Sequence, residues 1–316
     1  MKLHIHGVHV PNRKNTAELA ALRLPIPETV EIPMSMHIGA PAIPVVKPGE
    51  NVRVGQLIGK AGGFVSAPVY ASVSGTVKKI GQQVGSGGRL MQTVIIAADG
   101  RQEPDPDLKP PKLDTMQDFL DAVRASGMVG LGGAGFPTYG KLSNKADTIL
   151  MNCAECEPLL KLHRQLLGTH AREIMQAFAL IGETVGAKEM IIGIKKEYKG
   201  TIAALHQYID EFPGMRIHEL PGAYPMGDEV VLIYEATGRV VRPGGLPIEC
   251  GVAVFNVETL GNVYRAVWEQ RPVTEKYVTV VGEVEHPVTV RVPVGISIGE
   301  VTAMAGAVTV DDPVYL

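Results

Sequence analysis

Apolar residues between positions 31 and 98 occur in short runs separated by glycines and prolines. Runs of this length between turn residues predict strands. Lys47-Pro48-Gly49-Glu50 predicts a tight turn, because proline fixes φ and glycine permits the reversal. Strands so close along the chain predict a small all-β barrel or sandwich. The predicted strands are 32–34, 42–46, 52–54, 56–58, 64–65, 69–71, 75–77 and 93–97.

The hydrophobic pattern changes after residue 113, where helical spacing alternates with continuous apolar runs. Thr115 is expected to cap the first helix, and Thr259 is expected to start the last. Alternating helices and strands imply a mostly parallel sheet with helices on both faces. The predicted strands are 148–152, 189–194, 215–220 and 252–257, and the later helices are 172–184, 201–212, 229–237 and 260–269.

Two apolar runs near the C-terminus, 277–282 and 288–293, flank a turn at Glu285-His286-Pro287. They predict a β-hairpin, which is followed by a short helix at 298–305. The order strand, strand, helix favours a small β-grasp unit. A further strand would be expected after this helix, so we expect the chain to be truncated there.

A polar, proline-rich segment at 99–111 separates the all-β section from the alternating one. Proline at this density continues neither a helix nor a central strand, so the segment predicts a linker. The sequence therefore indicates an α/β multidomain protein. The expected units are an N-terminal domain at 1–100, a linker at 101–112, an α/β domain at 113–272 and a β-grasp domain at 273–316.

Composition and charge exclude several functions. The net charge is −3 and no basic run occurs, which argues against a nucleic-acid partner. No apolar stretch reaches the roughly 18 residues of a membrane helix, and the N-terminus lacks a signal-peptide core. Three cysteines are too few for a disulfide framework, which favours a cytoplasmic location. A peripheral place on the inner face of the cell membrane would require partner subunits.

The most distinctive segment is the loop from Gly130 to Thr138, with four glycines within six residues. Such a loop can turn several backbone N–H groups toward one anion, and a following helix N-terminus would add donors. No Gly-Lys-Ser/Thr follows, so this is not a P-loop. Lys141 could neutralise a phosphate. On glycine content alone, a tight turn without a ligand explains the loop equally well.

A second cluster, Asn152-Cys153-Ala154-Glu155-Cys156-Glu157-Pro158, directly follows a predicted buried strand. Ligands of open α/β sheets lie beyond the carboxyl ends of strands. Asn152 offers donors and acceptors, and Glu155 offers acceptors for hydroxyl groups. The Cys-x-x-Cys pair also suggests a metal. Only Cys250 remains as a further thiolate ligand, so no metal site is predicted.

Two further clusters open predicted helices: 224–229, with Tyr224, Gly227, Asp228 and Glu229, and 256–259, with Asn256 and Thr259. Acidic and capping residues in a first helical turn are ordinary features of any helix. Neither cluster alone indicates a ligand.

Residues 46–77 resemble biotinyl and lipoyl carrier domains, which are barrel-sandwich hybrids. The shared pattern is Val-Lys-Pro-Gly-Glu-x-Val-x-Val-Gly-Gln, followed by Ala67-Pro68-Val69 and Ser74-Gly75-Thr76-Val77. Carriers present a modifiable lysine on a hairpin tip, where this chain has Gly62-Gly63-Phe64-Val65. The resemblance therefore implies the fold without the carrier chemistry, and acylation of nearby Lys60 is not expected.

The four clusters, in this order, resemble the flavin-binding domain shared by the flavin subunit of respiratory complex I and the C subunit of the Rnf electron transport complex. Asn-x-Ala-Glu-Cys-Glu-Pro is similar to the Rnf and cobalamin-reductase branches. The N-terminal section, with Gly7-Val8-His9 and Met36-His37-Ile38-Gly39-Ala40-Pro41, resembles the N-terminal domain of the same Rnf protein. The C-terminal section resembles the soluble-ligand-binding β-grasp domain of the same proteins.

This resemblance implies FMN as cofactor and NADH as electron donor. Glu229 would lie near the nicotinamide and is the predicted catalytic residue. The residues implied to contact FMN are Gly130, Gly132, Gly133, Lys141, Asn152, Glu155, Tyr224, Gly227, Asp228, Glu229, Asn256 and Thr259.

Two features depart from the family pattern. Leu131 stands where complex I has arginine, which removes one charge from the phosphate site. Family members also continue into a ferredoxin-like domain with cysteine runs that this chain lacks, so 4Fe-4S clusters are expected only in such a missing domain.

The resemblance implies an NADH-linked flavin oxidoreductase subunit that exchanges electrons with a ferredoxin-like iron–sulfur partner. Its other partners would be subunits of a membrane electron-transport complex or a soluble reductase. The alternatives are a docking module and an electron-transfer protein of a cobalamin or proline reductase. Barrel-first order favours the Rnf type over the propanediol cobalamin reductase.

Overall fold

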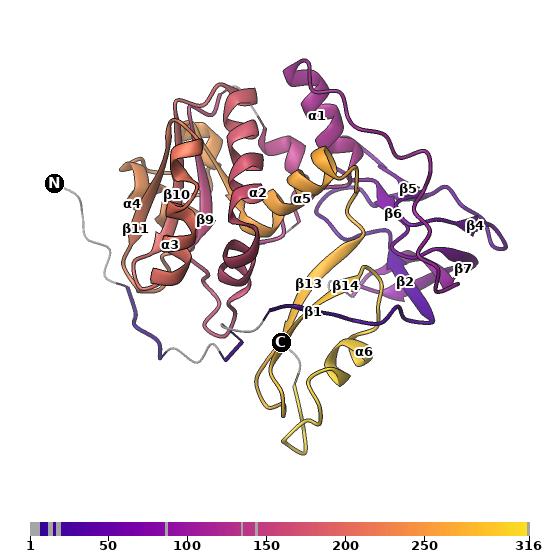
Figure 1. The fold of residues 1–316 in the computed structure, drawn as a ribbon. Helices are drawn as coiled ribbons and strands as arrows, with labels where there is room; N and C mark the ends of the chain where they lie inside the picture. The colour runs from indigo at the N-terminus through magenta and orange to yellow at the C-terminus, as the bar shows by residue number, and fades with distance from the viewer. Residues whose placement is uncertain are drawn as a thin grey trace.

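The computed structural model describes residues 7–11, 15–16, 20–85, 88–133, 135–142 and 145–314. Figure 1 shows a β-barrel section and an α/β section side by side, with a small sheet between and below them. The expected fold class is therefore confirmed: a barrel-sandwich, a parallel α/β sheet and a small C-terminal sheet. The division into units at 1–100, 113–272 and 273–316 stays a prediction.

The barrel section consists of two sheets around one apolar core that includes Val30, Ile58 and Ile96. The predicted strand at 64–65 is a bend. The strand predicted at 75–77 continues to Val84 and pairs along this length with the strand that follows it. Backbone hydrogen bonds hold this pair of strands together, so its outer part does not need alternating apolar residues. One sheet has the order β2 (Thr29–Pro33), β8 (Leu90–Ala98), β7 (Gly75–Val84), β4 (Asn51–Val52), and the other β3 (Ile43–Pro44), β5 (Leu57–Lys60), β6 (Val69–Tyr70).

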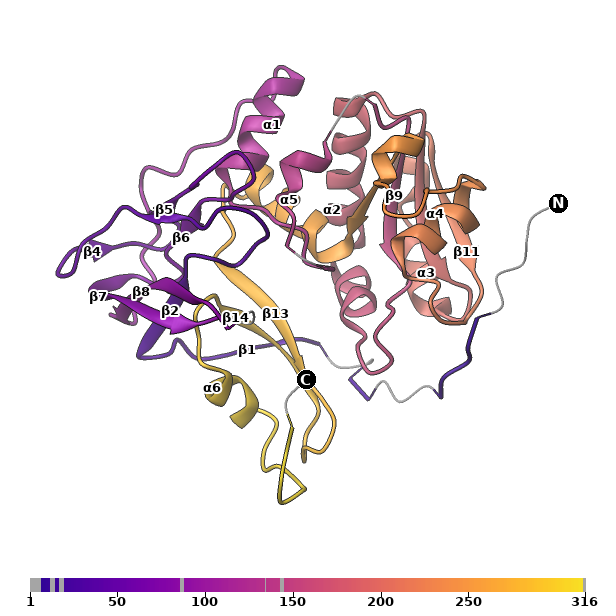
Figure 2. The same cartoon turned by 180° about the vertical axis from the view of Figure 1, so that it is seen from behind.

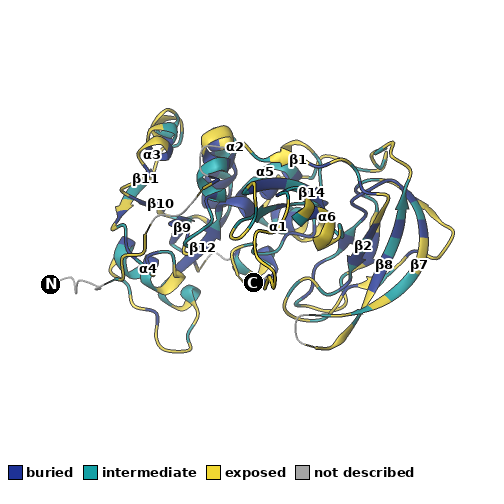
Figure 3. Cartoon of the chain, turned by 90° about the horizontal axis from the view of Figure 1, so that it is seen from below, coloured by how far each residue is buried: buried dark blue, intermediate teal, exposed yellow. Residues whose placement is uncertain are grey.

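The α/β section is built on four parallel strands in the order β11-β10-β9-β12. Alternate residues of the strands enter separate cores: Ile149 packs with one and Leu150 with the other. Figure 3 shows the buried residues concentrated along these strands. The strands are β9 (Thr148–Cys153), β10 (Glu189–Lys195), β11 (Met215–Leu220) and β12 (Val252–Asn256).

Helices cover both faces of this sheet, as predicted. The core that contains Ile149 also holds buried residues of α1 (Met116–Ala125), α2 (Leu162–Val185), α3 (Lys199–His206) and α5 (Val257–Trp268). The core that contains Leu150 holds those of α4 (Glu229–Thr237).

Three helix predictions need correction. Helix α2 begins at Leu162, ten residues before the predicted start, and bends at His170. Helix α5 starts at Val257 and not after Thr259, because the Asn256 side chain accepts the N–H groups of Glu258 and Thr259. The helix predicted at 201–212 is α3 followed by a short 3₁₀ turn, Ile209–Glu211. Thr115 caps α1 as predicted, with a capping box.

The strand order changes direction between β9 and β12. From β9 the chain passes to β10 and β11, and α4 then brings it back to β12 on the opposite side of β9. Asn152 and Asn256 are register partners at the carboxyl ends of β9 and β12. In open α/β sheets such a change of direction forms the ligand crevice.

The C-terminal hairpin consists of β13 (Glu275–Val280) and β14 (Val288–Pro293), followed by α6 (Ile298–Ala303), as predicted. A third strand comes from the opposite end of the chain. The short β1 (Leu22–Arg23) pairs in parallel with β14. Its two residues carry no periodic pattern, so the sequence did not indicate this pairing.

An ion cluster around Glu275 fastens β1 to this hairpin. The Glu275 carboxylate accepts hydrogen bonds from Arg23 at 2.6 Å and Arg271 at 2.8 Å, and also from Arg291. Burial raises the pKa of Glu275, but the Arg23 hydrogen bond and the charges of Arg291 and Arg271 outweigh burial, so the pKa is lowered.

Glu275→Gln should lower the free energy of unfolding by about 2–3 kcal/mol at pH 7, because three guanidinium groups lose their charged partner. The folded-state pKa is lowered, so the carboxylate stabilises the fold above its unfolded pKa of roughly 4.3, and this contribution is lost as pH falls through the folded pKa. Urea unfolding at pH 7 and pH 3.5 should therefore show a smaller difference between the two proteins at low pH. The control Glu219→Gln removes an exposed pair with Lys199 and should cost under about 0.5 kcal/mol. Equal stability of Glu275→Gln and wild type at pH 7 would refute the role of this cluster.

Candidate functional site

The glycine loop is closed at its base by an antiparallel bridge between Val129 and Pro137. Gly130 N–H donates to the Phe136 carbonyl at 2.8 Å, and Thr138 N–H donates to Met128 at 3.0 Å. Ala134 lies outside the described residues. A single 3₁₀ turn, Thr138–Lys141, follows the loop in place of the expected α-helix. Donors for an anion would therefore come from the loop itself.

Two neighbouring glycines in this loop have different surroundings. A Cβ on Gly132 would lie 2.8 Å from Asn256 Nδ2, whereas a Cβ on Gly133 would meet nothing within 4 Å. Both residues are exposed, and their N–H groups have no acceptor within the described parts of the chain. The loop thus holds Gly132 against the sheet edge and leaves two donors open beside it.

Thr259 ties the loop to the first turn of α5. Its buried hydroxyl accepts the Leu131 N–H at 3.1 Å and lies 3.5 Å from the Val129 carbonyl. Lys141, at the other end of the loop, donates to the Val254 carbonyl of β12 at 3.3 Å. Both predicted residues therefore fix the loop to the strand and helix that flank Asn256.

Asn256 connects three elements. Its side-chain oxygen caps α5 by accepting from Glu258 N–H at 2.9 Å and Thr259 N–H at 3.3 Å. Its Nδ2 lies 2.8 Å from Nε2 of His163 on α2. Together with its contact to Gly132, these bonds place Asn256 where the glycine loop, α2 and α5 meet.

Asn152 has a similar position at the end of β9. Its amide donates to the Gly227 carbonyl at 2.8 Å and its oxygen accepts the Ala154 N–H at 3.1 Å. A Cβ on Gly227 would lie 2.6 Å from Cys156 Sγ, so only glycine permits this approach. The second and third sequence clusters are therefore in direct contact.

Glu155 is engaged by the protein itself. Its φ is +39°, an uncommon value for a residue other than glycine. Its buried carboxylate accepts the His163 N–H at 2.7 Å and pairs with Arg164 Nε at 3.2 Å. These bonds hold the start of α2 against the end of β9, and a role of Glu155 toward FMN hydroxyls stays a prediction.

The segment 224–229 leads into α4. Tyr224 pairs through its backbone with Val8, and Lys195 Nζ lies 4.0 Å from its ring centroid. Burial, followed by the charge of Glu197, raises the pKa of Tyr224. Asp228 caps α4 by accepting from two N–H groups at 3.0 and 3.2 Å. Glu229 is exposed in the first turn of the same helix.

The sequence did not indicate a cluster of cations beneath the turn at Glu155. Lys195, 1% exposed at the end of β10, donates to the Glu155 carbonyl at 3.4 Å. Burial lowers its pKa, although nearby negative groups, Glu197 first, oppose the shift. The Arg164 guanidinium lies 3.9 Å from the Tyr198 ring centroid. The sequence signal that could have indicated this cluster is a lysine, Lys195, at the end of an otherwise apolar, buried strand.

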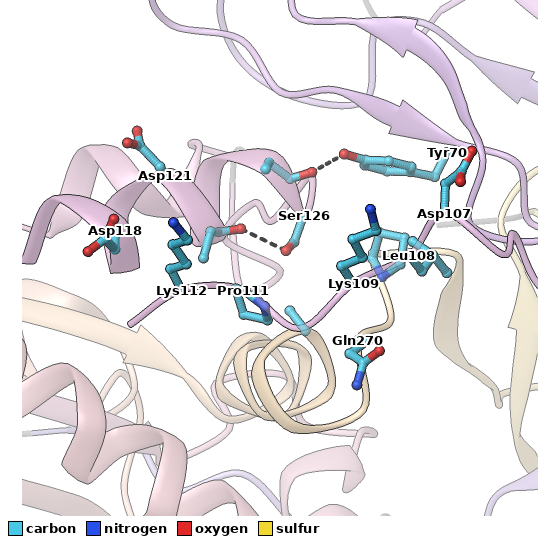
Figure 4. Close-up of a pocket in the computed structure, with 14 residues that line it drawn as sticks. Tyr70, Asp107, Leu108, Lys109, Pro111, Lys112, Asp118, Asp121, Ser126 and Gln270 are labelled. Atoms are coloured by element: carbon cyan, nitrogen blue, oxygen red, sulfur yellow. Dashed lines mark hydrogen bonds between the residues drawn. The ribbon is translucent and has the colours of Figure 1, made fainter. Parts of the chain in front are cut away.

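Two neighbouring cavities lie away from these residues. They measure about 380 and 410 Å³ and lie between the barrel, the linker, α1 and the end of α5. Figure 4 shows the first, in which the Tyr70 hydroxyl donates to the Ala125 carbonyl. Burial raises the pKa of Tyr70 to about 12. Neither cavity is lined by a predicted site residue, so we place the site at the strand ends, where polar groups from several loops converge.

The thiols differ in their surroundings. Cys153 is buried, and burial raises its pKa, whereas Cys156 is exposed and Cys250 is half-buried. In the described ranges, no group of three His, Cys, Asp or Glu side chains is placed to hold a metal ion. Among the described helices, none is both long and apolar enough to cross a membrane.

Comparison with known families gives two matches in succession. Residues 3–101 match the RnfC barrel-sandwich hybrid domain, and residues 123–265 match the Nuo51 FMN-binding domain. The second match contains the glycine loop and the clusters at 152–158, 224–229 and 256–259.

Three curated relatives are similar to this chain. The C subunit of the Na⁺-translocating ferredoxin:NAD⁺ oxidoreductase complex of Acetobacterium woodii is 37% identical over 95% of this chain and 70% of its own length. The C subunit of the ion-translocating oxidoreductase complex of Pseudomonas aeruginosa is 35% identical over 95% of this chain. Cobalamin reductase PduS of Citrobacter freundii is 46% identical over 63% of this chain. The chain spans only 40% and 44% of the length of the latter two proteins.

A solved structure also resembles this fold. The NAD⁺-reducing [NiFe]-hydrogenase, in its H₂-reduced state, has a chain that is 27% identical with a TM-score of 0.53. The similarity covers 60% of this chain and 39% of that one.

Proposed function

The chain belongs to the RnfC family, and from this premise we propose that it binds FMN at the carboxyl ends of β9 and β12. The proposed role is to pass electrons between NAD(H) and an iron–sulfur partner. The matched FMN-binding domain implies FMN itself. The main support for its position is that Asn152 and Asn256 are register partners at one sheet edge. Gly227 bonds to Asn152 and Gly132 packs against Asn256, so residues of all four clusters meet there.

The residues at this edge fit the phosphate of FMN. Gly132 and Gly133 offer adjacent, exposed N–H groups, and Gly133 faces open space. Lys141 supplies a cation at the base of the loop. We assign the phosphate to this loop and the hydroxyl-bearing chain and ring to the side of Asn152 and Tyr224. Bound FMN supplies the ability to take two electrons from a nicotinamide and release them singly.

The protein's own contribution is orientation. Asn256 holds Gly132, and Asn152 holds Gly227, so the two loops that face the proposed flavin are fixed to neighbouring strands. Exposed Glu229 lies two residues beyond Gly227, where it can orient the nicotinamide. Iron–sulfur clusters, and any association with a membrane complex, are proposed to belong to partner proteins or further domains.

The direct test is anaerobic titration of the purified chain with FMN, followed by NADH. We expect quenching of flavin fluorescence on binding and bleaching of the bound flavin's visible absorption by NADH. A chain that takes up no FMN at high concentration would refute the proposed site. A chain that takes up FMN but does not react with NADH would refute the proposed electron donor.

Glu229→Gln should leave FMN affinity within about threefold of wild type but slow NADH-dependent bleaching by about tenfold or more, because the nicotinamide loses a positioning contact. Stopped-flow measurement of bleaching separates the two effects. Glu235→Gln, on the same helix, serves as the control and should react at the wild-type rate. If Glu229→Gln also reacts at the wild-type rate, this residue does not contact the nicotinamide.

A second candidate function is electron supply to a cobalamin reductase, since PduS shares 46% identity with this chain. That similarity covers 63% of the chain. The RnfC barrel-sandwich match at 3–101 precedes the FMN-binding match at 123–265, which is the barrel-first order expected of the Rnf type.

A further inference from the structure

Three loops interlock where the barrel meets the glycine loop. A Cβ on Gly135 would lie 3.0 Å from the Met36 carbonyl, and the Ala40 N–H donates to Val65 at 2.9 Å. The Tyr139 hydroxyl donates to the Phe64 carbonyl. The loops are 36–41 and 61–66 of the barrel and 135–140 of the α/β section. Figure 2 shows the barrel loops reaching the segment between α1 and α2.

These loops expose large apolar side chains, which together we name the Phe64 patch. Phe64 is 81% exposed at a loop tip, and Ile38 is 51% exposed in the loop beside it. Met36 and Phe136 are 39% and 36% exposed. A single exposed apolar side chain is ordinary, but several on interlocked loops indicate a contact surface.

Two exposed cations lie beside the Phe64 patch. Exposed Lys60 ends β5 and pairs in register with Ile43. Exposed Arg124 lies 5.1 Å from the Tyr139 ring centroid, next to the Phe64 loop. Two cations therefore flank the patch on different sections of the protein.

The Phe64 patch also adjoins the proposed flavin loop directly. Gly135 and Phe136 belong both to that loop and to the interlocked surface. A protein bound at the patch would lie beside the segment that we assign to FMN. The patch thus combines exposed apolar groups, positive charge and a position next to the proposed electron source.

We propose that the Phe64 patch is the docking surface for an iron–sulfur electron carrier with an acidic surface. This inference rests on the proposed function, because it assigns a place to that function's iron–sulfur partner. Weak electron-transfer encounters have small interfaces, and complementary charge speeds their formation. The Lys60 and Arg124 cations attract and orient the carrier, and Phe64 supplies a small apolar contact.

The experiment measures binding of a fluorescently labelled, oxidised bacterial [4Fe-4S] ferredoxin to the full 316-residue chain, with and without FMN, at 20 and 300 mM NaCl. Binding at 20 mM salt should be several-fold tighter than at 300 mM, because exposed charges are screened. Lys60→Glu/Arg124→Glu should weaken binding about tenfold or more at 20 mM and much less at 300 mM. Phe64→Ser should weaken it about threefold to tenfold at both.

The matched control is Lys78→Glu/Lys79→Glu, which makes the same charge change on exposed residues of β7, in the other barrel sheet. Affinity within twofold of wild type is expected. An equal loss in this control would show unspecific charge attraction and overturn the proposal. Because Phe64 is exposed, its substitution should leave the unfolding midpoint unchanged, which distinguishes lost docking from lost folding.

The remaining outcomes separate docking from the proposed function. No ferredoxin binding by a chain whose FMN is bleached by NADH would overturn the docking surface alone. Patch-dependent ferredoxin binding by a chain that takes up no FMN would keep the docking surface and refute the proposed function. If vesicles of phosphatidylglycerol bind the chain through Phe64 while ferredoxin does not, the patch is a lipid-binding surface and the proposal is wrong.

Discussion

Replacing Gly133 by valine should abolish FMN binding while the chain remains folded. A Cβ at this position meets nothing within 4 Å, so the folded protein accommodates the larger side chain. The same open space is where we place the flavin phosphate, and the isopropyl group would occupy it. We expect the dissociation constant for FMN to rise at least 100-fold, which corresponds to about 2.8 kcal/mol. Fluorescence titration measures it directly.

Two comparisons make this result specific. Gly299→Val changes an exposed glycine of α6 whose Cβ would meet only Ser297 Oγ, at 4.0 Å, and it should bind FMN like wild type. Gly132→Ala should instead lower stability, because its Cβ would lie 2.8 Å from Asn256 Nδ2. If Gly133→Val binds FMN with wild-type affinity and an unchanged unfolding midpoint, the phosphate does not lie at this loop.

Asn256→Ala should reduce both stability and FMN affinity. The substitution removes the α5 cap, worth about 1 kcal/mol, and the bond to His163, worth about another 1 kcal/mol. Gly132 would lose the side chain against which it packs, so we expect the dissociation constant for FMN to rise about tenfold. Urea unfolding and FMN titration measure the two effects.

Asn256→Asp separates the two roles of this side chain. Aspartate is an equally good N-cap, so unfolding free energy should fall by less than about 1 kcal/mol. Its carboxylate cannot donate and would repel a phosphate near Gly132, so FMN affinity should fall as far as in the alanine variant. If the affinity of both variants equals that of wild type, Asn256 acts only in the fold.

Most of the fold could be predicted from local patterns. Continuous apolar runs between helical patterns predicted β9 to β12 and their parallel arrangement, because buried parallel strands need apolar side chains on both faces. The polar half of β7 was missed, since a two-stranded ribbon outside the core carries no apolar alternation. The start of α2 was also missed, because the segment from Leu162 to His170 is held by the Glu155 carboxylate, which accepts the His163 N–H, and this contact leaves no periodic signal in the sequence.

The structure brings the predicted clusters together and adds contacts that the sequence did not indicate. Motif order indicated that Asn152, Gly227 and Asn256 belong together, and the structure brings them to one edge of the sheet. Motif order did not indicate that Glu155 would pair with Arg164 or that Lys195 would be buried beneath Glu155. Which of these residues contact FMN stays a prediction.

The sequence by itself determined the elements and the chemistry available at their ends. Periodicity specifies helices and strands locally, and capping residues such as Thr115 specify where a helix begins. Only the tertiary structure decided which ends meet. Strand order places Asn256 beside Asn152, although more than one hundred residues separate them in the sequence. Packing of the barrel against the α/β section places the barrel loops against Gly135. These contacts depend on how separate elements pack, which local sequence patterns do not specify.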